Sequence, residues 1–123
     1  MEGLQNYEKE GRPWGDFERF TLNEKTTVKI ININPGEAFS LQTHAHRDEF
    51  WRIIGGTGTI TIGEEGTREA REGDTFYTPR GFVHRAEAGP EGLSFLEISH
   101  GDFDENDITR LADNYGRARD SAH

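Results

Sequence analysis

The chain has 123 residues, of which 30% are charged, with a formal net charge of −9 and no cysteine. This length accommodates one domain with its own core, and the lack of cysteine excludes a disulfide framework and thiolate chemistry. The acidic balance, without any stretch that is both basic and aromatic, argues against nucleic acid and an anionic membrane surface as partners. The first residues lack the basic start and apolar run of a signal peptide, and no apolar run reaches membrane-spanning length, so we expect a cytoplasmic protein.

Glycine recurs every several residues, and between the glycines Thr, Ile, Val and Phe alternate with polar residues. Alternation with a period of two predicts half-buried strands. The expected strands are 17–22, 27–33, 39–43, 50–54, 58–62, 67–71, 75–78, 84–87 and 93–99. Gly63-Glu64-Glu65-Gly66 is expected to be a hairpin loop, because glycine readily adopts the positive φ of tight turns. Many short strands at regular spacing predict an all-β antiparallel sandwich or barrel.

The two ends of the chain depart from this pattern. Residues 1–16 are mostly polar and predict an N-terminal arm, either loose or laid across a neighbouring chain. Residues 17–103 form the predicted barrel, and 104–123 form a C-terminal segment that packs on it and ends in a disordered tail. The first part of that segment, as far as Tyr115, is expected to be a short helix with Asp104 as its N-cap.

Three of the five histidines lie in two short segments that together predict a metal site. On a strand, residues two apart share a face, so the side chains of Gln42, His44 and His46 are expected to project together. Glu49 follows just past a turn, and a Pro–Gly turn begins the strand that carries His84. Imidazole and carboxylate ligands of this kind bind a divalent metal and leave coordination positions open. Either Glu49 or Gln42 supplies the oxygen ligand.

The same residues carry a resemblance to a known family. Gly36, His44-x-His46, Glu49 and Gly56 resemble the first cupin motif. The second cupin motif is matched at every spacing by Gly73-x5-Pro79-x-Gly81-x2-His84. Residues 12–117 resemble the C-terminal cupin domain of type II mannose-6-phosphate isomerases, which is usually fused to a mannose-1-phosphate guanylyltransferase. The residues that carry this likeness are Arg12-Pro13-Trp14-Gly15, Val28-Lys29, Pro35-Gly36, Ser40-Leu41-Gln42, His46-Arg47-x-Glu49-x-Trp51, His84-Arg85, Asp107-Ile108, Asp113 and Tyr115-Gly116-Arg117.

The chain also departs from that family at several positions. Two residues separate His46 from Glu49, where most cupins have three or four between the second histidine and the glutamate. Ala45 and Phe50 replace histidines that are common in the family, and Ala88 replaces an asparagine. We expect these replacements to reduce the polarity near the pocket without removing a metal ligand.

The resemblance implies a cupin jelly-roll barrel and a metal-dependent isomerase that interconverts mannose 6-phosphate and fructose 6-phosphate through a cis-enediol. It implies one divalent metal, with zinc as the first choice and manganese, iron, nickel or cobalt as the others. The reaction needs a base that moves a proton between two carbons. The expected bases are Glu97 and Lys29, together with whichever of Glu49 and His46 is not a ligand. Glu97 alternates with apolar neighbours, so it either faces solvent or points inward as that base.

A sugar phosphate also needs cations, because guanidinium groups match phosphate oxygens. The expected substrate-binding residues are Arg12, Trp14, Arg47, Arg110, Tyr115 and Arg117, with Lys29 as a further cation. Trp14 lies in a turn, where it forms either a lid over an open barrel end or a wall of the pocket. The strand aromatics are expected to fill the core instead: Phe39, Trp51, Phe76 and Phe95.

Two other function classes fit the same residues. One is a non-catalytic cupin that keeps the metal and binds a sugar or a small carboxylate. The other is an iron-dependent dioxygenase, because a site of three histidines and one glutamate also suits Fe(II). In every case the unpaired edge strands and the polar arm predict a homodimer.

Overall fold

The computed structural model describes residues 1–64 and 66–112, and this part of the chain forms strands, turns and loops without a helix. No helix long and apolar enough to cross a membrane is found among these residues. The strands are β1 (Glu8–Arg12), β2 (Gly15–Arg19), β3 (Thr26–Ile33), β4 (Leu41–Thr43), β5 (Arg47–Ile62), β6 (Thr67–Arg71), β7 (Thr75–Thr78), β8 (His84–Gly101) and β9 (Thr109–Ala112).

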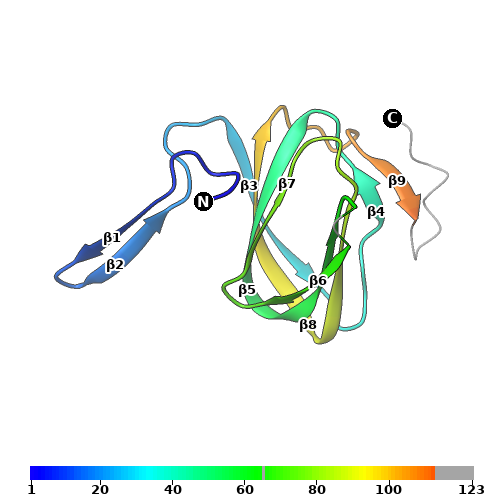
Figure 1. Cartoon of the computed structure of the whole chain (residues 1–123), viewed down its shortest axis with the longest axis horizontal. Helices are drawn as coiled ribbons and strands as arrows, with labels where there is room; N and C mark the ends of the chain where they lie inside the picture. Colours follow the sequence, from blue (N-terminus) through cyan, green and yellow to red (C-terminus); the bar gives the residue numbers. More distant parts are fainter. Residues whose placement is uncertain (65, 113–123) are drawn as a thin grey trace.

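Two long antiparallel strands, β5 and β8, run side by side through the barrel and connect its two sheets (Figure 1). Where β5 begins and β8 ends, β7 pairs with β5 and β3 pairs with β8. Where β5 ends and β8 begins, β6 pairs with β5, while β4 pairs with β8 and β9. The result is the antiparallel barrel that the sequence predicts.

Glycine allows β5 and β8 to bend where one sheet passes into the other. The pairing of the two strands shifts register on both sides of Gly56, which has a φ of 75°. A Cβ atom at Gly56 would lie 2.1 Å from the carbonyl oxygen of Gly92, so only glycine permits this backbone approach. The sequence predicts separate strands at 50–54 and 58–62 and at 84–87 and 93–99. The structure instead has one continuous, bent strand in each place, β5 and β8.

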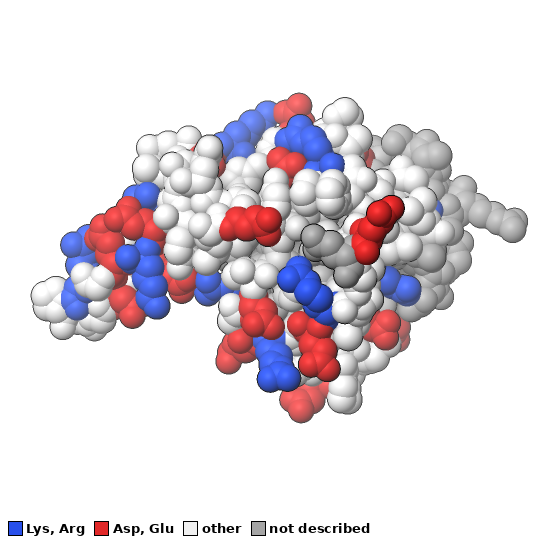
Figure 2. All heavy atoms as spheres, viewed as in Figure 1, with Lys and Arg blue, Asp and Glu red and all other residues white. Residues whose placement is uncertain are grey.

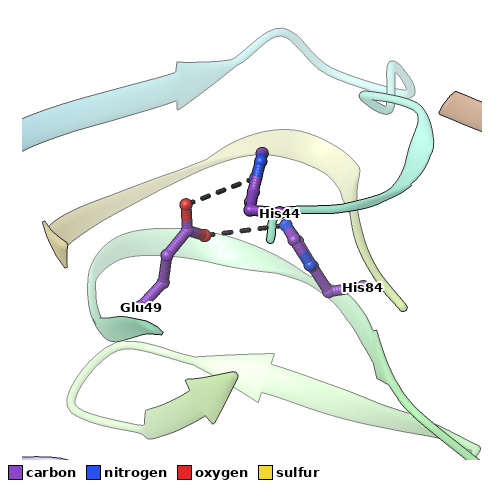
Figure 3. Close-up of side chains that lie close together, drawn as sticks. All are labelled: His44, Glu49 and His84. Atoms are coloured by element: carbon purple, nitrogen blue, oxygen red, sulfur yellow. Dashed lines mark ion pairs between the residues drawn. The ribbon is translucent and has the colours of Figure 1, made fainter. Parts of the chain in front are cut away.

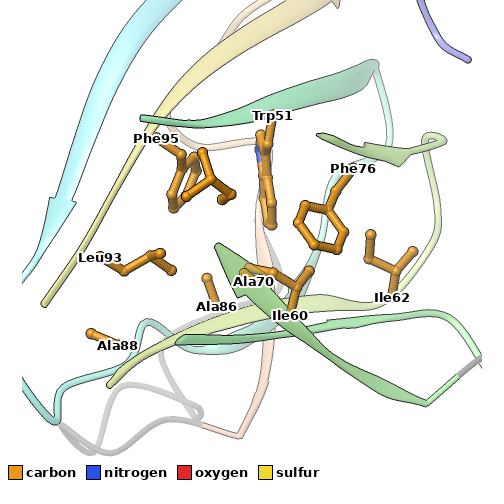
Figure 4. Close-up of a cluster of buried hydrophobic side chains, with 10 residues drawn as sticks. Trp51, Ile60, Ile62, Ala70, Phe76, Ala86, Ala88, Leu93 and Phe95 are labelled. Atoms are coloured by element: carbon orange, nitrogen blue, oxygen red, sulfur yellow. The ribbon is translucent and has the colours of Figure 1, made fainter. Parts of the chain in front are cut away.

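The main core fills the inside of the barrel (Figure 4). Trp51 and Phe95 are almost fully buried, with ring centroids 4.7 Å apart, and Phe76 is 5% exposed. Phe39 packs against the edge of this cluster. The expectation that these aromatic residues belong to the core is confirmed for Trp51, Phe76 and Phe95, whereas Phe39 packs on the core and also lines a cavity. Burying aromatic and branched side chains removes apolar surface from water, which is the main favourable contribution to folding.

The N-terminal residues cover the outer face of the sheet. Leu4 is 3% exposed and packs with Phe50 and Ile98 in a second apolar cluster. Beyond this contact, β1 and β2 pair as a hairpin that extends away from the barrel (Figure 1). The predicted arm is thus an anchored segment followed by a protruding hairpin, and its turn carries Trp14, which is 74% exposed.

The helix predicted to start at Asp104 is wrong for the described residues. The Asp104 carboxylate accepts a hydrogen bond from the Asn106 backbone, and its carbonyl oxygen accepts one from the Asp107 backbone. These contacts close a tight turn, because an aspartate side chain can bond the backbone two residues ahead. The chain then enters β9, which no sequence pattern predicted. Residues 113–115 lie outside the described part of the chain.

Charged side chains of both signs are interspersed over the face of the molecule that Figure 2 shows. Basic and acidic groups alternate over the β1–β2 hairpin and over the end of the barrel near β6. This face therefore presents no extended field of one sign, which suits a solvated surface.

Candidate metal centre

His44, Glu49 and His84 converge inside the barrel with their ligand atoms within 4.8 Å of one another (Figure 3). Each is at most 4% exposed. The two carboxylate oxygens of Glu49 face one imidazole each: Oε2 lies 3.4 Å from His44 Nε2, and Oε1 lies 3.6 Å from His84 Nε2. Two ligands bound tetrahedrally to one ion at about 2.1 Å lie about 3.4 Å apart. The spacing of Glu49 Oε1 and His84 Nε2 therefore fits two ligands of a single bound cation.

Backbone carbonyl groups fix both imidazole rings in the orientation that a metal requires. His44 Nδ1 lies 2.6 Å from the carbonyl oxygen of Asp107, and His84 Nδ1 lies 3.2 Å from that of Phe82. Since a carbonyl only accepts, each Nδ1 is the donor and each Nε2 carries a lone pair. Both Nε2 lone pairs point into the cluster, as in metal sites whose histidines are held through the other ring nitrogen.

The fourth side chain at this point is Gln42. Its amide nitrogen lies 3.4 Å from the Nε2 atoms of both His44 and His84. Its amide oxygen accepts a hydrogen bond from the Ser40 hydroxyl at 2.8 Å. Because a hydroxyl either donates or accepts, Ser40 can hold the amide in both orientations. A half-turn of the amide would place the Gln42 oxygen against a cation.

The ionisation states of the cluster also suit metal binding. Burial lowers the pKa of His44 and lowers the pKa of His84 to about 4, so both imidazoles are neutral at pH 7. Burial opposes ionisation of Glu49, but the positive charge that the imidazoles carry in acid and the Arg47 guanidinium outweigh it and hold the pKa of Glu49 below its ordinary value. The site therefore offers neutral imidazoles and a carboxylate, the protonation states that bind metal.

One atom of the cluster is left without a partner. Among the described residues, Glu49 Oε1 is buried and makes no hydrogen bond. A buried carboxylate oxygen in this condition costs free energy unless a cation or a donor meets it. The residues present therefore fit a divalent metal, which His44, Glu49 and His84 could hold, with Gln42 beside them.

His46, a predicted ligand, lies outside this cluster, so that assignment is wrong. Strand β4 ends at Thr43, and the chain bends at 44–46 before β5 begins. Alternation of faces holds only within a strand, and the bend leaves the His46 side chain exposed. Counted from His44 instead, four residues precede Glu49, a spacing within the range of most cupins.

A cavity of about 200 Å³ adjoins the cluster. It is lined by Lys29, Ile31, Phe39, Gln42, His44, Arg47, Glu49, Glu97, Glu105, Ile108 and Arg110. Glu97 therefore points inward, where it accepts a hydrogen bond from the Trp51 indole at 3.2 Å. Burial and the negative charge of Glu49 raise the pKa of Glu97 to about 7.

Lys29 lies directly opposite Glu97 in the β3–β8 ladder, and both side chains reach the cavity. The Lys29 ammonium pairs with Glu105 at 3.0 Å and lies over the Phe103 ring. The cavity is thus lined by the carboxyl group of Glu97, whose pKa is raised to about 7, and by the cation Lys29.

The matching family model, described as the C-terminal region of mannose-6-phosphate isomerase, covers residues 2–113. The chain belongs to this family. It is 37% identical over 108 residues to the mannose-1-phosphate guanylyltransferase ManC of Salmonella typhimurium. It is 37% identical over 120 residues to the alginate biosynthesis protein AlgA of Pseudomonas aeruginosa. These matches cover 86% and 96% of this chain but only 22% and 25% of the two relatives.

Solved structures confirm the fold of this family member. Oxalate decarboxylase from Bacillus subtilis superposes with a TM-score of 0.65 and 30% identity, over 72% of this chain and 24% of the enzyme. A double-stranded β-helix protein from Klebsiella pneumoniae superposes with a TM-score of 0.58 and 24% identity, over 64% of this chain and 70% of that protein. The barrel is therefore a cupin.

The structure does not bring every predicted substrate-binding residue of this family member to the cavity. Arg47 and Arg110 line it. Arg12 and Trp14 are exposed on the β1–β2 hairpin, where Arg12 pairs with Glu10 at 2.7 Å. Tyr115 and Arg117 lie outside the described residues.

The departures from the family pattern lie away from the cavity. Phe50 packs on the outer face of the sheet, Ala45 is exposed in the bend before β5, and Ala88 is buried in the main core. None of the three residues lines the cavity, so the expected reduction in polarity near the pocket stays a prediction.

Asp107 has a structural role at the site that sequence analysis did not assign. Its carboxylate accepts hydrogen bonds from the backbone of Ala45 at 2.8 Å and His46 at 2.9 Å, and its carbonyl orients His44. Asp107 thus fixes the bend that separates the ligand His44 from the exposed His46. The only sequence signal was its place in the family resemblance, which carries no information about such long-range contacts.

Proposed function

We propose that this domain is a metal-dependent isomerase that interconverts mannose 6-phosphate and fructose 6-phosphate. The observation that carries the proposal is one cavity that is lined by His44 and Glu49 of the metal-ligand cluster and by the inward carboxyl group of Glu97. An aldose–ketose isomerisation needs an electrophile at the carbonyl and a base beside it. Family membership supports a phosphorylated sugar as the substrate. The domain spans about a quarter of the length of the curated relatives that it matches. The isomerase activity is therefore proposed for this domain alone.

The metal would be held by Gln42, His44, Glu49 and His84. When bound, it would polarise the sugar carbonyl and the adjacent hydroxyl, which makes the proton alpha to the carbonyl easier to remove. Imidazole and oxygen ligands suit zinc, and they also suit manganese, iron, nickel and cobalt.

Glu97 is the residue that would move the proton. As the carboxylate it takes the proton from one carbon of the sugar, and as the acid it returns the proton to the neighbouring carbon of the cis-enediol. Burial raises the pKa of Glu97 to about 7 in the absence of a cation, so a bound cation would leave the carboxyl group able to take and return a proton near neutral pH. The Trp51 indole donor and the Ser99 hydroxyl, 3.5 Å from Oε1, orient the carboxyl group. Lys29 is the weaker candidate, because Glu105 already holds its ammonium.

The phosphate would meet the cations that line the cavity. Lys29 on β3 and Arg110 on β9 both line this space. Arg117, which follows β9 in sequence, remains a further proposed contact on the basis of the family resemblance. Guanidinium groups bind phosphate through two parallel hydrogen bonds, which favours arginine for this role.

A second candidate function is favoured by the ligand set itself. Two histidines and one carboxylate form the facial triad of non-haem Fe(II) oxygenases, and His44, His84 and Glu49 supply those groups. The dioxygenase alternative therefore survives with two histidines in place of the three expected. The support for a non-catalytic binding domain is reduced, because Ala45 and Phe50 lie outside the cavity.

The deciding experiment is metal analysis of the purified protein, followed by a coupled assay with mannose 6-phosphate. Zinc together with isomerase activity supports the proposal. Iron together with oxygen consumption, and no turnover of the sugar phosphate, supports the dioxygenase. One equivalent of metal without either activity supports a binding domain.

We also propose a homodimer in which the protruding hairpin of one chain covers β3 of the other. Within the described residues, β3 pairs only with β8, so its outer edge is free. Val28 and Ile30 on this strand are 56% and 60% exposed. An apolar edge strand of this kind invites pairing, and the exposed Trp14 and Phe17 of the hairpin offer a complementary apolar surface.

A further inference from the structure

The guanidinium of Arg47 lies inside the metal-ligand cluster rather than at the surface. Only 6% of Arg47 is exposed. Its Nε donates to Glu49 Oε2 at 3.0 Å, and its Nη2 lies 3.2 Å from His44 Nε2. Its Nη1 donates to the carbonyl of Asp104 at 3.2 Å, and the Phe103 ring stacks on the guanidinium at 4.4 Å. Arg47 is therefore held from several sides in one orientation.

This contact makes the two oxygens of Glu49 unequal. Oε2 accepts the charge-assisted hydrogen bond from Arg47, whereas Oε1 is buried without a hydrogen-bond partner and faces His84. A carboxylate can bind a metal through one oxygen or through both. An oxygen that already accepts this charge-assisted hydrogen bond is a poorer metal ligand than the free one beside it. The longer contact of Arg47 Nη2 with His44 Nε2 would give way when a metal takes that lone pair.

We propose that Arg47 is a positioning residue that reserves Glu49 Oε1 for the metal and keeps Glu49 a one-oxygen ligand. A position on the ion that the second oxygen would otherwise take then stays open for substrate. The inference rests on the metal site of the proposed function but does not depend on the reaction that the site performs.

The local sequence supports this arrangement. Arg47 and Glu49 are two apart on β5, so both side chains project to the inner face. Lysine cannot replace the contact, because a guanidinium supplies several donors in a rigid plane and an ammonium acts as a point charge. Asp48 lies between them on the outer face, and Arg80 binds it through Nε at 3.2 Å and Nη2 at 3.1 Å. The exposed Arg80–Asp48 pair is thus a matched control for the buried pair.

The test uses the visible absorption of Co(II) added to the full chain after its metal has been removed with a chelator. Co(II) absorbs less strongly as its coordination number rises. In Arg47→Met both oxygens of Glu49 become available, so we expect a several-fold fall in molar absorption relative to the wild type. Arg47→Lys keeps the charge without the planar donors, and we expect a smaller fall in the same direction. Arg80→Met should match the wild type.

Each result separates this inference from the metal site itself. A wild-type spectrum in both Arg47 variants overturns the positioning role while leaving the metal site intact. Failure of the wild-type protein to bind Co(II) overturns the metal site and with it the proposed function. If circular dichroism shows that Arg47→Met is unfolded, the comparison of Arg47→Lys with Arg80→Met decides, and equal spectra overturn the inference.

Discussion

Gln42 lies directly opposite His84 in the β4–β8 ladder, and the Gln42 amide nitrogen is 3.4 Å from His84 Nε2. This pairing joins the two halves of the metal site, because β4 leads into His44 and β8 begins at His84. An uncharged amide takes the place beside the second imidazole. Among the described residues, Glu49 supplies the only carboxylate of the candidate ligand group, so a bound divalent cation would retain net positive charge and favour an anionic or electron-rich substrate oxygen.

Replacing His84 with alanine should remove most of the bound metal. A backbone carbonyl holds the His84 imidazole in place as a ligand, so its loss weakens metal binding. Without the metal, Glu49 Oε1 is left buried and without a partner. Metal content measured by mass spectrometry on dialysed protein, with about one equivalent expected in the wild type, tests this directly. His46→Ala is the control, because His46 is exposed and should leave the metal content unchanged. Equal metal content in the wild type and His84→Ala would refute the site.

The motif histidines show what residue spacing predicts and what it does not. Residue spacing correctly located the segments, and the second motif correctly predicted the place of His84. The choice between His44 and His46 required knowledge of where β4 ends, which is decided by the Asp107 carboxylate more than sixty residues away in the sequence. A contact of that range leaves no periodic signal in the chain.

The same reasoning explains which strands were predicted. The strand 67–71 was predicted with the bounds that the structure shows, because glycines delimit it at Gly66 and Gly73. The strand 27–33 was predicted within one residue, and burial alternates along it with a period of two. The strands β1 and β9 are short and polar, so they form through pairing with a neighbour rather than through a local pattern. The inward direction of Glu97 was left open for a related reason, since a carboxylate among apolar residues becomes inward only through the register of β8 with β3 and β5.

Replacing Glu97 with glutamine should reduce kcat by ~10²–10⁴ and leave the metal content unchanged, because the amide cannot accept the substrate proton. The wild-type rate should rise with pH as the carboxyl group ionises. Its pKa of about 7 places that rise near neutral pH, and the charge of a bound cation moves it lower. A pH profile of kcat/KM with mannose 6-phosphate measures both effects. Glu87→Gln, at an exposed position of the same strand, should behave as the wild type. A Glu97→Gln enzyme with the wild-type rate would exclude Glu97 as the base.

Glu18 should contribute stability that is lost in acid. Arg52 Nη2 donates a hydrogen bond to Glu18 Oε1 at 2.9 Å. This contact lowers the pKa of Glu18 from its ordinary value of 4.5 to about 2. A lowered pKa stabilises the fold above about pH 4.5, and this contribution disappears as the pH falls towards 2. Since the pair is partly exposed, we expect Glu18→Gln to lose roughly 1–2 kcal/mol at pH 7.

Urea denaturation of the Glu18 variant at several pH values tests this contribution. Glu18→Gln should show a shallower loss of stability than the wild type between pH 4.5 and 2. Glu69→Gln removes a more exposed carboxylate that pairs with Arg71 at 3.5 Å, and its pH dependence should follow the wild type. Parallel acid limbs in all three proteins would contradict the assignment.

The proposed dimer predicts a sedimentation mass near twice the chain mass of 13.9 kDa at micromolar concentration. Ile30→Lys places a charge on the exposed face of β3 and should shift the protein towards the monomer, because a lysine on an edge strand opposes pairing with another chain. Leu111→Lys, on the exposed surface of β9, should leave the dimer unchanged. A wild-type monomer at this concentration would refute the dimer, and a dimeric Ile30→Lys would exclude β3 as its interface.

Replacing Arg110 with alanine should raise KM for mannose 6-phosphate about 10- to 100-fold without affecting the metal content. Arg110 lines the cavity, and a charge-assisted contact with phosphate is worth ~1.5–3 kcal/mol, which corresponds to that range. Arg110→Lys should recover only part of the affinity, because the planar arrangement of donors is lost. Arg117→Ala belongs in the same assay, since the family resemblance proposes a phosphate contact there. Arg71→Ala, at an exposed position on β6, should leave KM unchanged. If the wild-type protein binds unphosphorylated mannose as tightly as the phosphate ester, the cavity has no phosphate subsite, and the domain is better explained as a binding protein for neutral sugars.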